Sequence, residues 1–129
     1  MPKKEVRTAK APQAIGPYSQ GVIAEGKKFI FVSGQLPLDP HTGEFAGNSI
    51  GEQTRQSLEN VKAVLAAAGA GMDAVVKTTV FLQNMGDFAG MNGVYKEYFA
   101  GVFPCRAAIE AAALPKGALV EIEAIAISA

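Results

Sequence analysis

Short apolar runs broken by glycine and proline fill the first third of the chain, a pattern typical of β-strands. Weak alternation over residues 3–9 predicts a short edge strand, and the proline-containing stretches that follow predict a loop ending at Tyr18. Residues 19–24 and 29–33 then predict two strands, joined by a tight hairpin turn at residues 25–27. Because the run FIFV has no polar face, the second of these strands should be covered on both sides.

The next apolar pattern has helical spacing and predicts a long helix. Ser49, with Glu52 three residues later, forms the capping box that often starts a helix. The apolar positions then repeat every three or four residues and stop at Gly69, which predicts a helix over residues 50–68. Residues 75–83 are rich in β-branched side chains and predict a strand.

A second, weaker helix should follow this strand. Asp87 can cap it, and the apolar residues at helical spacing are Phe88, Met91, Tyr95 and Tyr98. Gly90 and Gly93 each cost about 1 kcal/mol relative to alanine, so packing rather than propensity must hold this helix. Asn92 is the exception on the apolar face, because its spacing puts a polar amide between Phe88 and Tyr95.

The order of these elements, with two more strands near the C-terminus, is β, β, β, α, β, α, β, β. It predicts an α+β fold in which both helices pack on one face of a mixed sheet. We find no repeat or linker, so residues 1–129 are expected to form one domain. The other face of such an apolar sheet would be bare, and self-association is the simplest way to cover it.

The charge balance and cysteine content narrow the class of protein. Twelve basic and twelve acidic residues give a formal net charge of zero, which argues against electrostatic binding to nucleic acid or to an anionic membrane. The single cysteine excludes an internal disulfide and fits a reducing compartment. The N-terminus lacks the apolar run of a signal peptide, and no stretch approaches a membrane span. We therefore expect a soluble cytoplasmic protein.

The common signatures of nucleotide, triad and metal chemistry are missing. There is no GxxxxGK[ST] and no GxGxxG after a strand. His41 is the only histidine, so neither a Ser-His-Asp triad nor a histidine–cysteine metal site is expected, and we interpret His41 as a solvated loop residue. Cys105 adjoins Arg106, which could activate a thiol. Strand alternation turns the two side chains to opposite faces, so we interpret Cys105 as an unreactive buried residue.

Residues 104–126 carry charge where buried strands should carry none. Two apolar, strand-like runs flank a turn at residues 115–117, and their charged residues are Arg106, Glu110, Glu121 and Glu123. In a simple hairpin, Arg106 and Glu121 would lie about five residues, on the order of 16 Å, apart along the ladder. Arg106 and Glu121 therefore cannot form an ion pair with each other within such a hairpin.

Two interpretations of these charges stay open from the residues alone. In the first, they form cross-strand or intersubunit salt bridges. In the second, Arg106 of one chain and Glu121 of a neighbouring chain converge on one small anion at a subunit boundary. The planar guanidinium suits a carboxylate, and a partly buried glutamate could accept a proton from water.

From near Ala11 to its C-terminus, the chain resembles the Rid family (reactive intermediate deaminases, also called YjgF). The segments that carry the resemblance, in compatible order and spacing, are IGPYSQGV, FVSGQLP, QSLENVKAVLAAAG, VVKTTVFL, DFAGMN and R…LPKGALVEIEAIA. The resemblance implies a fold similar to trimeric chorismate mutase. In that fold two helices cover one face of each sheet, and three subunits pack their sheets into a central barrel.

The resemblance also implies a reaction: hydrolysis of reactive 2-imino acids, such as 2-iminobutanoate and 2-iminopropanoate, to 2-oxo acids and ammonia. This would protect pyridoxal-phosphate enzymes and would need no metal or organic cofactor. Arg106 would clamp the substrate carboxylate, and Glu121 would orient or deprotonate the attacking water. The other pocket residues implied by the resemblance are Tyr18, Ser33, Gly34 and Asn92.

Ala108 departs from the family pattern, because many members have a cysteine there. The change removes a thiol but leaves the Arg106–Glu121 pair. Two alternatives to the deaminase remain. One is a single-stranded RNA endoribonuclease or translation inhibitor, an activity reported for some relatives, although zero net charge and the lack of a basic stripe speak against it. The other is a non-catalytic trimer that binds a 2-oxo acid through Arg106 without needing Glu121.

Overall fold

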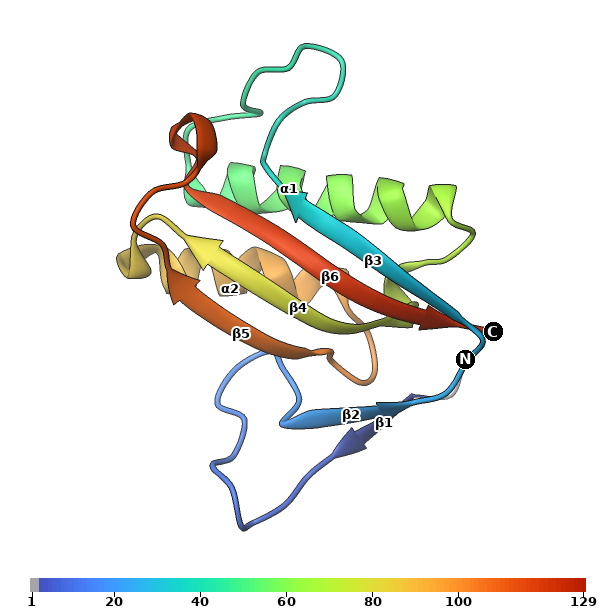
Figure 1. The fold of residues 1–129 in the computed structure, drawn as a ribbon. Helices are drawn as coiled ribbons and strands as arrows, with labels where there is room; N and C mark the ends of the chain where they lie inside the picture. Colours follow the sequence, from blue (N-terminus) through green and yellow to red (C-terminus); the bar gives the residue numbers. More distant parts are fainter. Residues whose placement is uncertain (1–2) are drawn as a thin grey trace.

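The computed structural model describes residues 3–129 as a four-stranded mixed sheet with two helices and a separate two-stranded hairpin (Figure 1). The helices and strands are β1 (Lys3–Val6), β2 (Gly21–Ala24), β3 (Lys28–Gln35), α1 (Ile50–Ala67), β4 (Val75–Leu82), α2 (Phe88–Tyr95), β5 (Cys105–Glu110) and β6 (Val120–Ser128). In the large sheet the strand order is β3-β6-β4-β5, with β6 antiparallel to both neighbours and β5 parallel to β4. The predicted α+β class and element order are confirmed.

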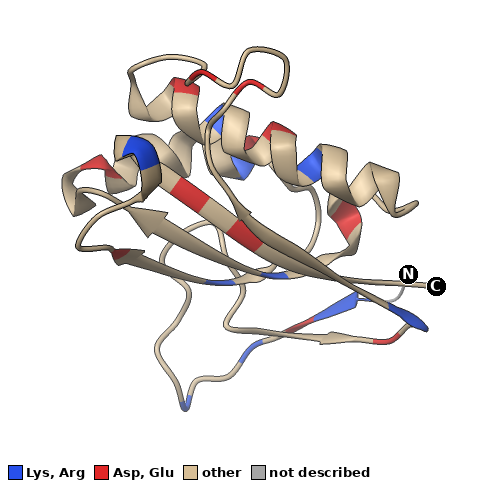
Figure 2. Ribbon diagram, turned by 45° about the horizontal axis from the view of Figure 1, so that its top comes forward, with Lys and Arg blue, Asp and Glu red and all other residues tan. Residues whose placement is uncertain are grey.

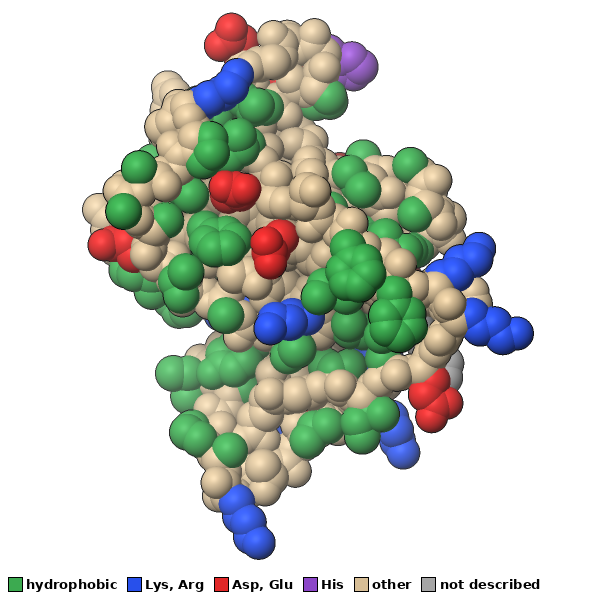
Figure 3. Space-filling view, in the orientation of Figure 1, with side chains coloured by type: hydrophobic (Ala, Val, Ile, Leu, Met, Phe, Trp, Pro, Cys, Tyr) green, Lys and Arg blue, Asp and Glu red, His purple; other side chains and the backbone are tan. Residues whose placement is uncertain are grey.

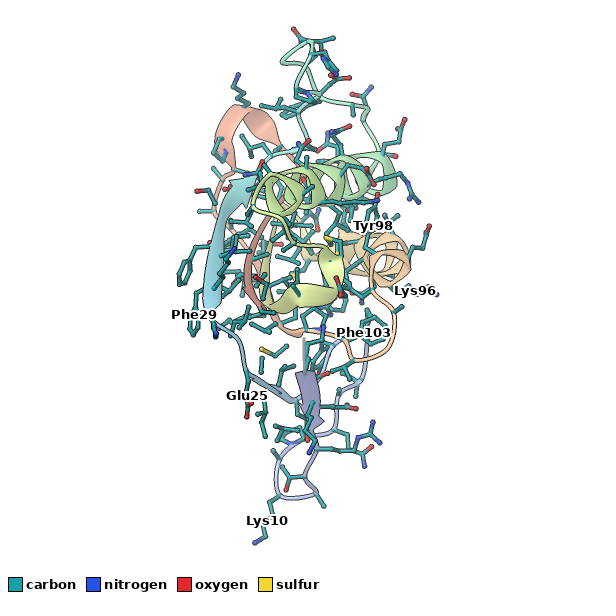
Figure 4. All side chains as sticks on the ribbon, turned by 90° about the vertical axis from the view of Figure 1, so that its right-hand side faces the viewer. Lys10, Glu25, Phe29, Lys96, Tyr98 and Phe103 are labelled. Carbon is teal, nitrogen blue, oxygen red and sulfur yellow. The ribbon has the colours of Figure 1, made fainter. Side chains whose placement is uncertain are left out.

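Both helices lie on one face of the large sheet, as predicted (Figures 1 and 4). Apolar residues from the helices and from alternate strand positions form one buried core; its main members are Leu58, Val61, Leu65, Val80, Leu82, Met91, Tyr95, Val120 and Ile122. Within residues 3–129, no helix combines the length and apolar character that crossing a membrane requires.

Helix α1 starts and ends where the sequence pattern indicates. The Ser49 hydroxyl accepts a hydrogen bond from the Glu52 N–H at 3.1 Å, and the Glu52 carboxylate accepts one from the Ser49 N–H at 3.3 Å. This reciprocal pair confirms the predicted capping box. The helix ends at Ala67, and Gly69 follows in the left-handed region at φ 80°, where glycine is favoured.

Helix α2 is shorter than predicted and is capped differently. Asp87 occupies the predicted N-cap position, but its side chain makes no capping hydrogen bond. Asn84 instead caps the preceding 3₁₀ turn, accepting from the N–H two residues later at 2.7 Å. The final turn, Lys96–Tyr98, is also 3₁₀. At Gly90 an added Cβ would stand 2.7 Å from the Ile50 side chain, so this glycine permits the close approach of α2 to α1.

The hairpin predicted at residues 25–27 is wrong. β2 pairs with β1, whereas β3 pairs with β6 in the large sheet. The Lys27 N–H donates to the Ser128 carbonyl at 2.9 Å, and the same carbonyl leaves no room for a Cβ at Gly26. The turn is therefore pressed against the end of β6, and it carries the chain from the small sheet to the large one.

The simple hairpin considered for residues 104–126 does not form, because β4 lies between β5 and β6. Alternate residues of β6 are almost wholly buried, and this strand takes a central position, whereas the more exposed β5 takes an edge. The connection passes over the end of β4: the Ala111 N–H donates to the Leu82 carbonyl, and the Gln83 N–H donates to the Leu119 carbonyl.

The face of the large sheet away from the helices is uncovered in the single chain. Phe29 is 61% exposed, Phe31 70% and Ile109 48%. Figure 4 shows Phe29 on the side of the sheet opposite the helices, and Figure 3 shows large hydrophobic side chains gathered on this face beside acidic groups. The two-sided cover predicted for the FIFV run is therefore not supplied within the chain. We refer to this surface, with Phe29, Phe31 and Ile109, as the bare face.

Candidate functional site

Arg106 lies on edge strand β5, opposite Thr78 of β4, and its side chain reaches the face that the helices cover. One guanidinium nitrogen, Nη1, donates to the Asn92 side-chain oxygen at 2.6 Å. The guanidinium is half-buried, and this burial lowers the pKa of Arg106, while Tyr95 and Tyr18 act in the opposite direction. Within residues 3–129, no carboxylate comes within ion-pair distance of it. Arg106 is thus a partly desolvated cation whose partner here is a neutral amide.

Three aromatic rings surround this cation. The guanidinium carbon lies 4.9 Å from the ring centre of Tyr95, 5.3 Å from that of Tyr18 and 5.5 Å from that of Phe88. Such contacts attract a cation through the negative face of the ring, and they hold the guanidinium in place. They do not neutralise its charge, so the charge remains available to an anion. We call Tyr18, Phe88 and Tyr95 the aromatic box.

Tyr95 is the fixed wall of the aromatic box. Its hydroxyl and the Thr78 hydroxyl are hydrogen-bonded at 2.7 Å, and both side chains are buried. Burial raises the pKa of Tyr95 to about 12, against the opposing effects of the Thr78 hydrogen bond and the Arg106 charge. The ring therefore stays neutral at ordinary pH and keeps a defined orientation beside the guanidinium.

Tyr18 belongs to the loop between β1 and β2, and this loop is tied to the start of β5. The Ser19 N–H donates to the Pro104 carbonyl at 3.1 Å, and the Ser19 hydroxyl donates to the carbonyl of Phe103. Ser19 and Cys105 also form an isolated parallel bridge. These contacts bring the loop to within one residue of Arg106, and so they explain why two segments far apart in sequence meet at one site.

Glu121 and Gly34 meet on the bare face. Pairing of β3 with β6 breaks after Val32 and resumes at Gln35, so Ser33 and Gly34 form a β-bulge. A Cβ added at Gly34 would overlap the Glu121 carboxylate. Only glycine lets the backbone come this close to the acid.

The sequence-predicted residues therefore form two groups within one chain. Arg106, Asn92 and Tyr18 lie together at the edge of the helix-covered face, whereas Glu121, Ser33 and Gly34 lie on the bare face. On β4, Arg106 is opposite Thr78 and Glu121 is opposite Phe81. Three positions along a strand reverse the face, so the two groups do not meet in the single chain.

His41 and Cys105, the other two residues considered in the sequence analysis, belong to neither group. His41 is exposed in its loop, as predicted. The Cys105 thiol is half-buried and donates to the Val76 carbonyl at 3.2 Å, in register with Lys77 rather than on the side of Arg106. Within the described residues, no three histidine, cysteine or acidic side chains gather closely enough to hold a metal ion.

Sequence reasoning missed Phe88, Tyr95 and Thr78 as parts of the site. It assigned the two aromatic residues to the core, where Tyr95 is indeed buried. The misplaced amide of Asn92 was the available signal, because an amide on an apolar helix face marks a nearby polar group that its neighbours also touch. Thr78 sits in a β-branched run and gives no such signal.

Comparison with known proteins places this geometry in a family. The family model described as endoribonuclease L-PSP matches residues 8–128. The chain is 52% identical over 124 residues to a RutC family protein of Pyrococcus horikoshii, covering 96% of this chain and 97% of the relative. It is 50% identical over 125 residues to a protein of Bos taurus named 2-iminobutanoate/2-iminopropanoate deaminase, covering 97% of this chain and 90% of the relative.

Solved structures agree with the sequence comparison. The crystal structure of E. coli TdcF with bound serine superposes with a TM-score of 0.76 at 43% identity, covering 98% of this chain and 99% of that one. The crystal structure of the E. coli YjgF gene product gives a TM-score of 0.74 at 46% identity, covering 96% and 98% of the two chains. The chain therefore belongs to the Rid family of YjgF-like proteins, whose family model carries the description endoribonuclease L-PSP.

Proposed function

We propose that the protein is a deaminase that hydrolyses 2-imino acids to 2-oxo acids and ammonia. The observation that carries the proposal is Arg106, a half-buried guanidinium held by Asn92 and the aromatic box, with no carboxylate partner among residues 3–129. A cation in this state gains most from a small carboxylate that it can bind through two parallel hydrogen bonds. Every 2-imino acid carries such a carboxylate beside its reactive carbon.

The name of the Bos taurus relative, 2-iminobutanoate/2-iminopropanoate deaminase, supports 2-iminobutanoate and 2-iminopropanoate as substrates. Both have short apolar side chains, which suit a pocket walled by Tyr18 and Phe88. In the proposed reaction, the Arg106 guanidinium holds the substrate carboxylate and the Asn92 amide fixes the guanidinium. The carboxylate thereby sets the position of the imine carbon relative to the attacking water.

The chemistry that remains is a proton transfer. Glu121 accepts a proton from water as the water oxygen bonds to the imine carbon, and the π electrons of the C=N bond move to nitrogen. The protonated Glu121 then returns its proton to the amine nitrogen of the carbinolamine, and the C–N bond breaks as ammonia leaves. The hydroxyl proton passes to the Glu121 carboxylate as the C=O bond of the 2-oxo acid forms. A protonated imine is already electrophilic, so a positioned base worth about 10²–10⁴-fold is a sufficient catalyst.

The two groups of site residues require a second chain to meet. We propose a homotrimer with a central barrel, in which the bare face of each chain is covered by its neighbours. Exposed Phe29 and Phe31 support this, since burying each would stabilise the assembly by roughly 1.5–3 kcal/mol. In this arrangement Arg106, Asn92 and Tyr18 of one chain face Glu121, Ser33 and Gly34 of the next.

The test is ammonia release from 2-iminobutanoate made in situ by a threonine dehydratase. The wild-type protein should accelerate the release, and Arg106→Ala should abolish this while the assembly stays folded. Arg55→Ala is the matched control, because Arg55 is an exposed arginine of α1 paired with Glu97 at 3.1 Å. Ammonia release by Arg106→Ala at the wild-type rate would refute the proposal.

Glu121→Gln separates the enzyme from a trimer that only binds 2-oxo acids. The deaminase requires that catalysis be lost while binding of 2-oxobutanoate through Arg106 is kept. Full turnover by Glu121→Gln would remove Glu121 from the reaction.

The description endoribonuclease L-PSP raises RNA cleavage as a second function. Acidic and basic residues are interspersed along α1 and across the large sheet (Figure 2), so these two elements offer single-stranded RNA no continuous basic track. We therefore expect no RNA binding at low salt. Binding that weakens steeply as salt rises would favour the ribonuclease.

A further inference from the structure

Gln20 has no part in the proposed reaction, yet its side chain makes four hydrogen bonds to the loop in front of Arg106. Its amide nitrogen lies 2.6 Å from the Pro12 carbonyl oxygen, 3.1 Å from that of Thr8 and 3.2 Å from that of Ala11. Its amide oxygen accepts from the Thr8 N–H at 2.7 Å. An amide nitrogen has two hydrogens, so one of them is shared between two carbonyls. Gln20 thus directs both amide hydrogens and its amide oxygen to one loop.

Apart from the Gln20 contacts, few hydrogen bonds hold the backbone of residues 8–17. The Lys10 N–H donates to the Thr8 hydroxyl at 3.1 Å, and the Ile15 N–H donates to the Tyr18 hydroxyl at 3.4 Å. Among backbone–backbone hydrogen bonds of residues 3–129, the one that involves this stretch runs from the Tyr18 N–H to the Gly16 carbonyl at 2.8 Å. Most of the stretch is exposed. Exposed segments with few backbone bonds and little burial open easily. The hydrogen bonds of the Gln20 side chain take the place of the backbone pairing that a strand would have.

What the loop carries is one wall of the proposed substrate pocket. It leads through Gly16 to Tyr18, whose ring centre is 5.3 Å from the guanidinium carbon. A Cβ added at Gly16 would touch Arg106 Nη2 at 3.7 Å, so the loop backbone itself lies against the cation. Ser19 ties the far end of the loop to β5. The Gln20 side chain holds the other end of the loop, through its hydrogen bonds to Thr8, Ala11 and Pro12.

We propose that Gln20 is a positioning residue: it holds the loop of residues 8–17 so that Tyr18 lies against Arg106, and it thereby sets the affinity for the substrate carboxylate. As far as it concerns the substrate, this inference rests on the proposed deaminase. Without the hydrogen bonds of Gln20, the loop spends part of its time away from Arg106. If the bound-like arrangement falls to one-tenth occupancy, the apparent Kd and KM rise about tenfold. The kcat changes little, because Glu121 and its water lie elsewhere.

The decisive variant is Gln20→Met, which keeps the length of the side chain and removes all four hydrogen bonds. Gln13→Met is the matched control, because Gln13 is an exposed glutamine of the same loop with no side-chain hydrogen bond to residues 3–129. The loop is followed by ¹⁹F NMR of protein containing 3-fluorotyrosine. The chain has three tyrosines, so three signals result, and Tyr18→Phe assigns one of them.

In Gln20→Met we expect the Tyr18 signal to move towards its position in the urea-unfolded chain, while the signals of Tyr95 and Tyr98 stay in place. The Kd of 2-oxobutanoate and the KM for 2-iminobutanoate should both rise about tenfold, with kcat within about twofold of wild type. Gln13→Met should match the wild type in all of these. If Gln20→Met shifts all three signals, its fold is lost, and Gln20→Glu, which keeps only the bond from the Thr8 N–H, replaces it.

An unchanged Tyr18 signal in the folded variant would overturn the positioning role. A moved signal with unchanged 2-oxobutanoate affinity would overturn the link to the pocket, as would a fall in kcat at constant KM. If the wild-type protein hydrolyses no imine, the proposed deaminase fails. The Tyr18 signal and the 2-oxobutanoate affinity still decide the role of Gln20 in that case.

Discussion

Arg106 and Glu121 lie on opposite faces of one sheet, with strand β4 between the strands that carry them. On β4 their register partners are Thr78 and Phe81, three positions apart. Arg106 contacts α2 through Asn92, whereas Glu121 lies over Gly34 on the face that no helix covers. A small substrate touching both side chains must therefore lie between two chains.

This relationship predicts that two inactive variants complement each other. Chains with Arg106→Ala and chains with Glu121→Ala should each be inactive alone. In trimers assembled at random from equal amounts of both, about one site in four combines an intact Arg106 with an intact Glu121 from the next chain. We expect ammonia release at about a quarter of the wild-type rate from co-expressed, differently tagged chains.

The control for complementation is a mixture of the two variants purified separately and combined without unfolding. Because subunits of a stable trimer exchange slowly, this mixture should stay inactive. If both residues acted within one chain, no mixed trimer would contain a complete site. Failure of co-expressed chains to regain activity would then contradict a site that combines Arg106 of one chain with Glu121 of the next.

A charge on the bare face should prevent assembly. Phe31 is 70% exposed in the single chain, and Phe31→Asp would place a carboxylate where the proposed barrel is closed. Burying a carboxylate in the interface costs several kcal/mol of free energy, which is more than the burial of one phenylalanine contributes. We expect a monomer by analytical ultracentrifugation, and loss of imine hydrolysis with it.

Val64→Asp is the control for this experiment. Val64 is 39% exposed on α1, on the other side of the molecule from the bare face. Replacing this exposed apolar residue by aspartate should leave both the assembly and the activity intact. An active Phe31→Asp monomer would contradict the intersubunit site directly.

Local patterns in the sequence predicted most of the helices and strands, but they did not predict which strands pair. The capping box at Ser49, the helical spacing after it and the β-branched run of β4 depend on neighbours a few residues apart, so the chain specifies them locally. The hairpin predicted at residues 25–27 and the one considered for residues 104–126 are both absent for one reason. A turn such as residues 115–117 fixes where the chain bends, but whether the next strand pairs with the last is decided by which strand is most apolar.

The same limit applies to the site. Arg106 and Glu121 could be singled out because charge on an apolar strand is unusual. That they occupy opposite faces in this sheet follows from the register of β5 and β6 against β4, a tertiary fact. The aromatic box was not predicted, because Phe88 and Tyr95 have the helical spacing of ordinary core residues. Only the contact with a guanidinium distinguishes them.

Gly34→Ala should lower kcat while the protein stays folded. The added Cβ overlaps the Glu121 carboxylate, which must rotate away from its position. A displacement of about 1 Å in a reacting group can cost 10²-fold, so we expect kcat to fall about 10- to 100-fold with a smaller change in KM. Steady-state ammonia release measures this. Gly93→Ala is the control: it has no atom within 4 Å of the new Cβ and should only stabilise α2, by up to about 1 kcal/mol.

Burial of the Tyr95 hydroxyl should make the folded protein less stable at alkaline pH. The pKa of Tyr95 is raised from 10.0 to about 12 by burial. Between these values the folded chain keeps a proton that the unfolded chain has lost, so the free energy of unfolding decreases as pH rises. The contribution is fully present below about pH 10 and is lost towards pH 12, in total about 2–3 kcal/mol.

Tyr95→Phe isolates this effect. At pH 8 the variant should be less stable by about 1–3 kcal/mol, because the buried Thr78 hydroxyl loses its partner. As pH rises from 9 to 11.5, the wild type should approach the variant, since phenylalanine has no proton to lose and the other titrating residues are common to both. Urea unfolding at one fixed protein concentration measures the gap, which controls for assembly. A gap that stays constant over this range would mean that Tyr95 titrates in the folded protein as it does in the unfolded chain, and that its ring is not the buried wall of the Arg106 site.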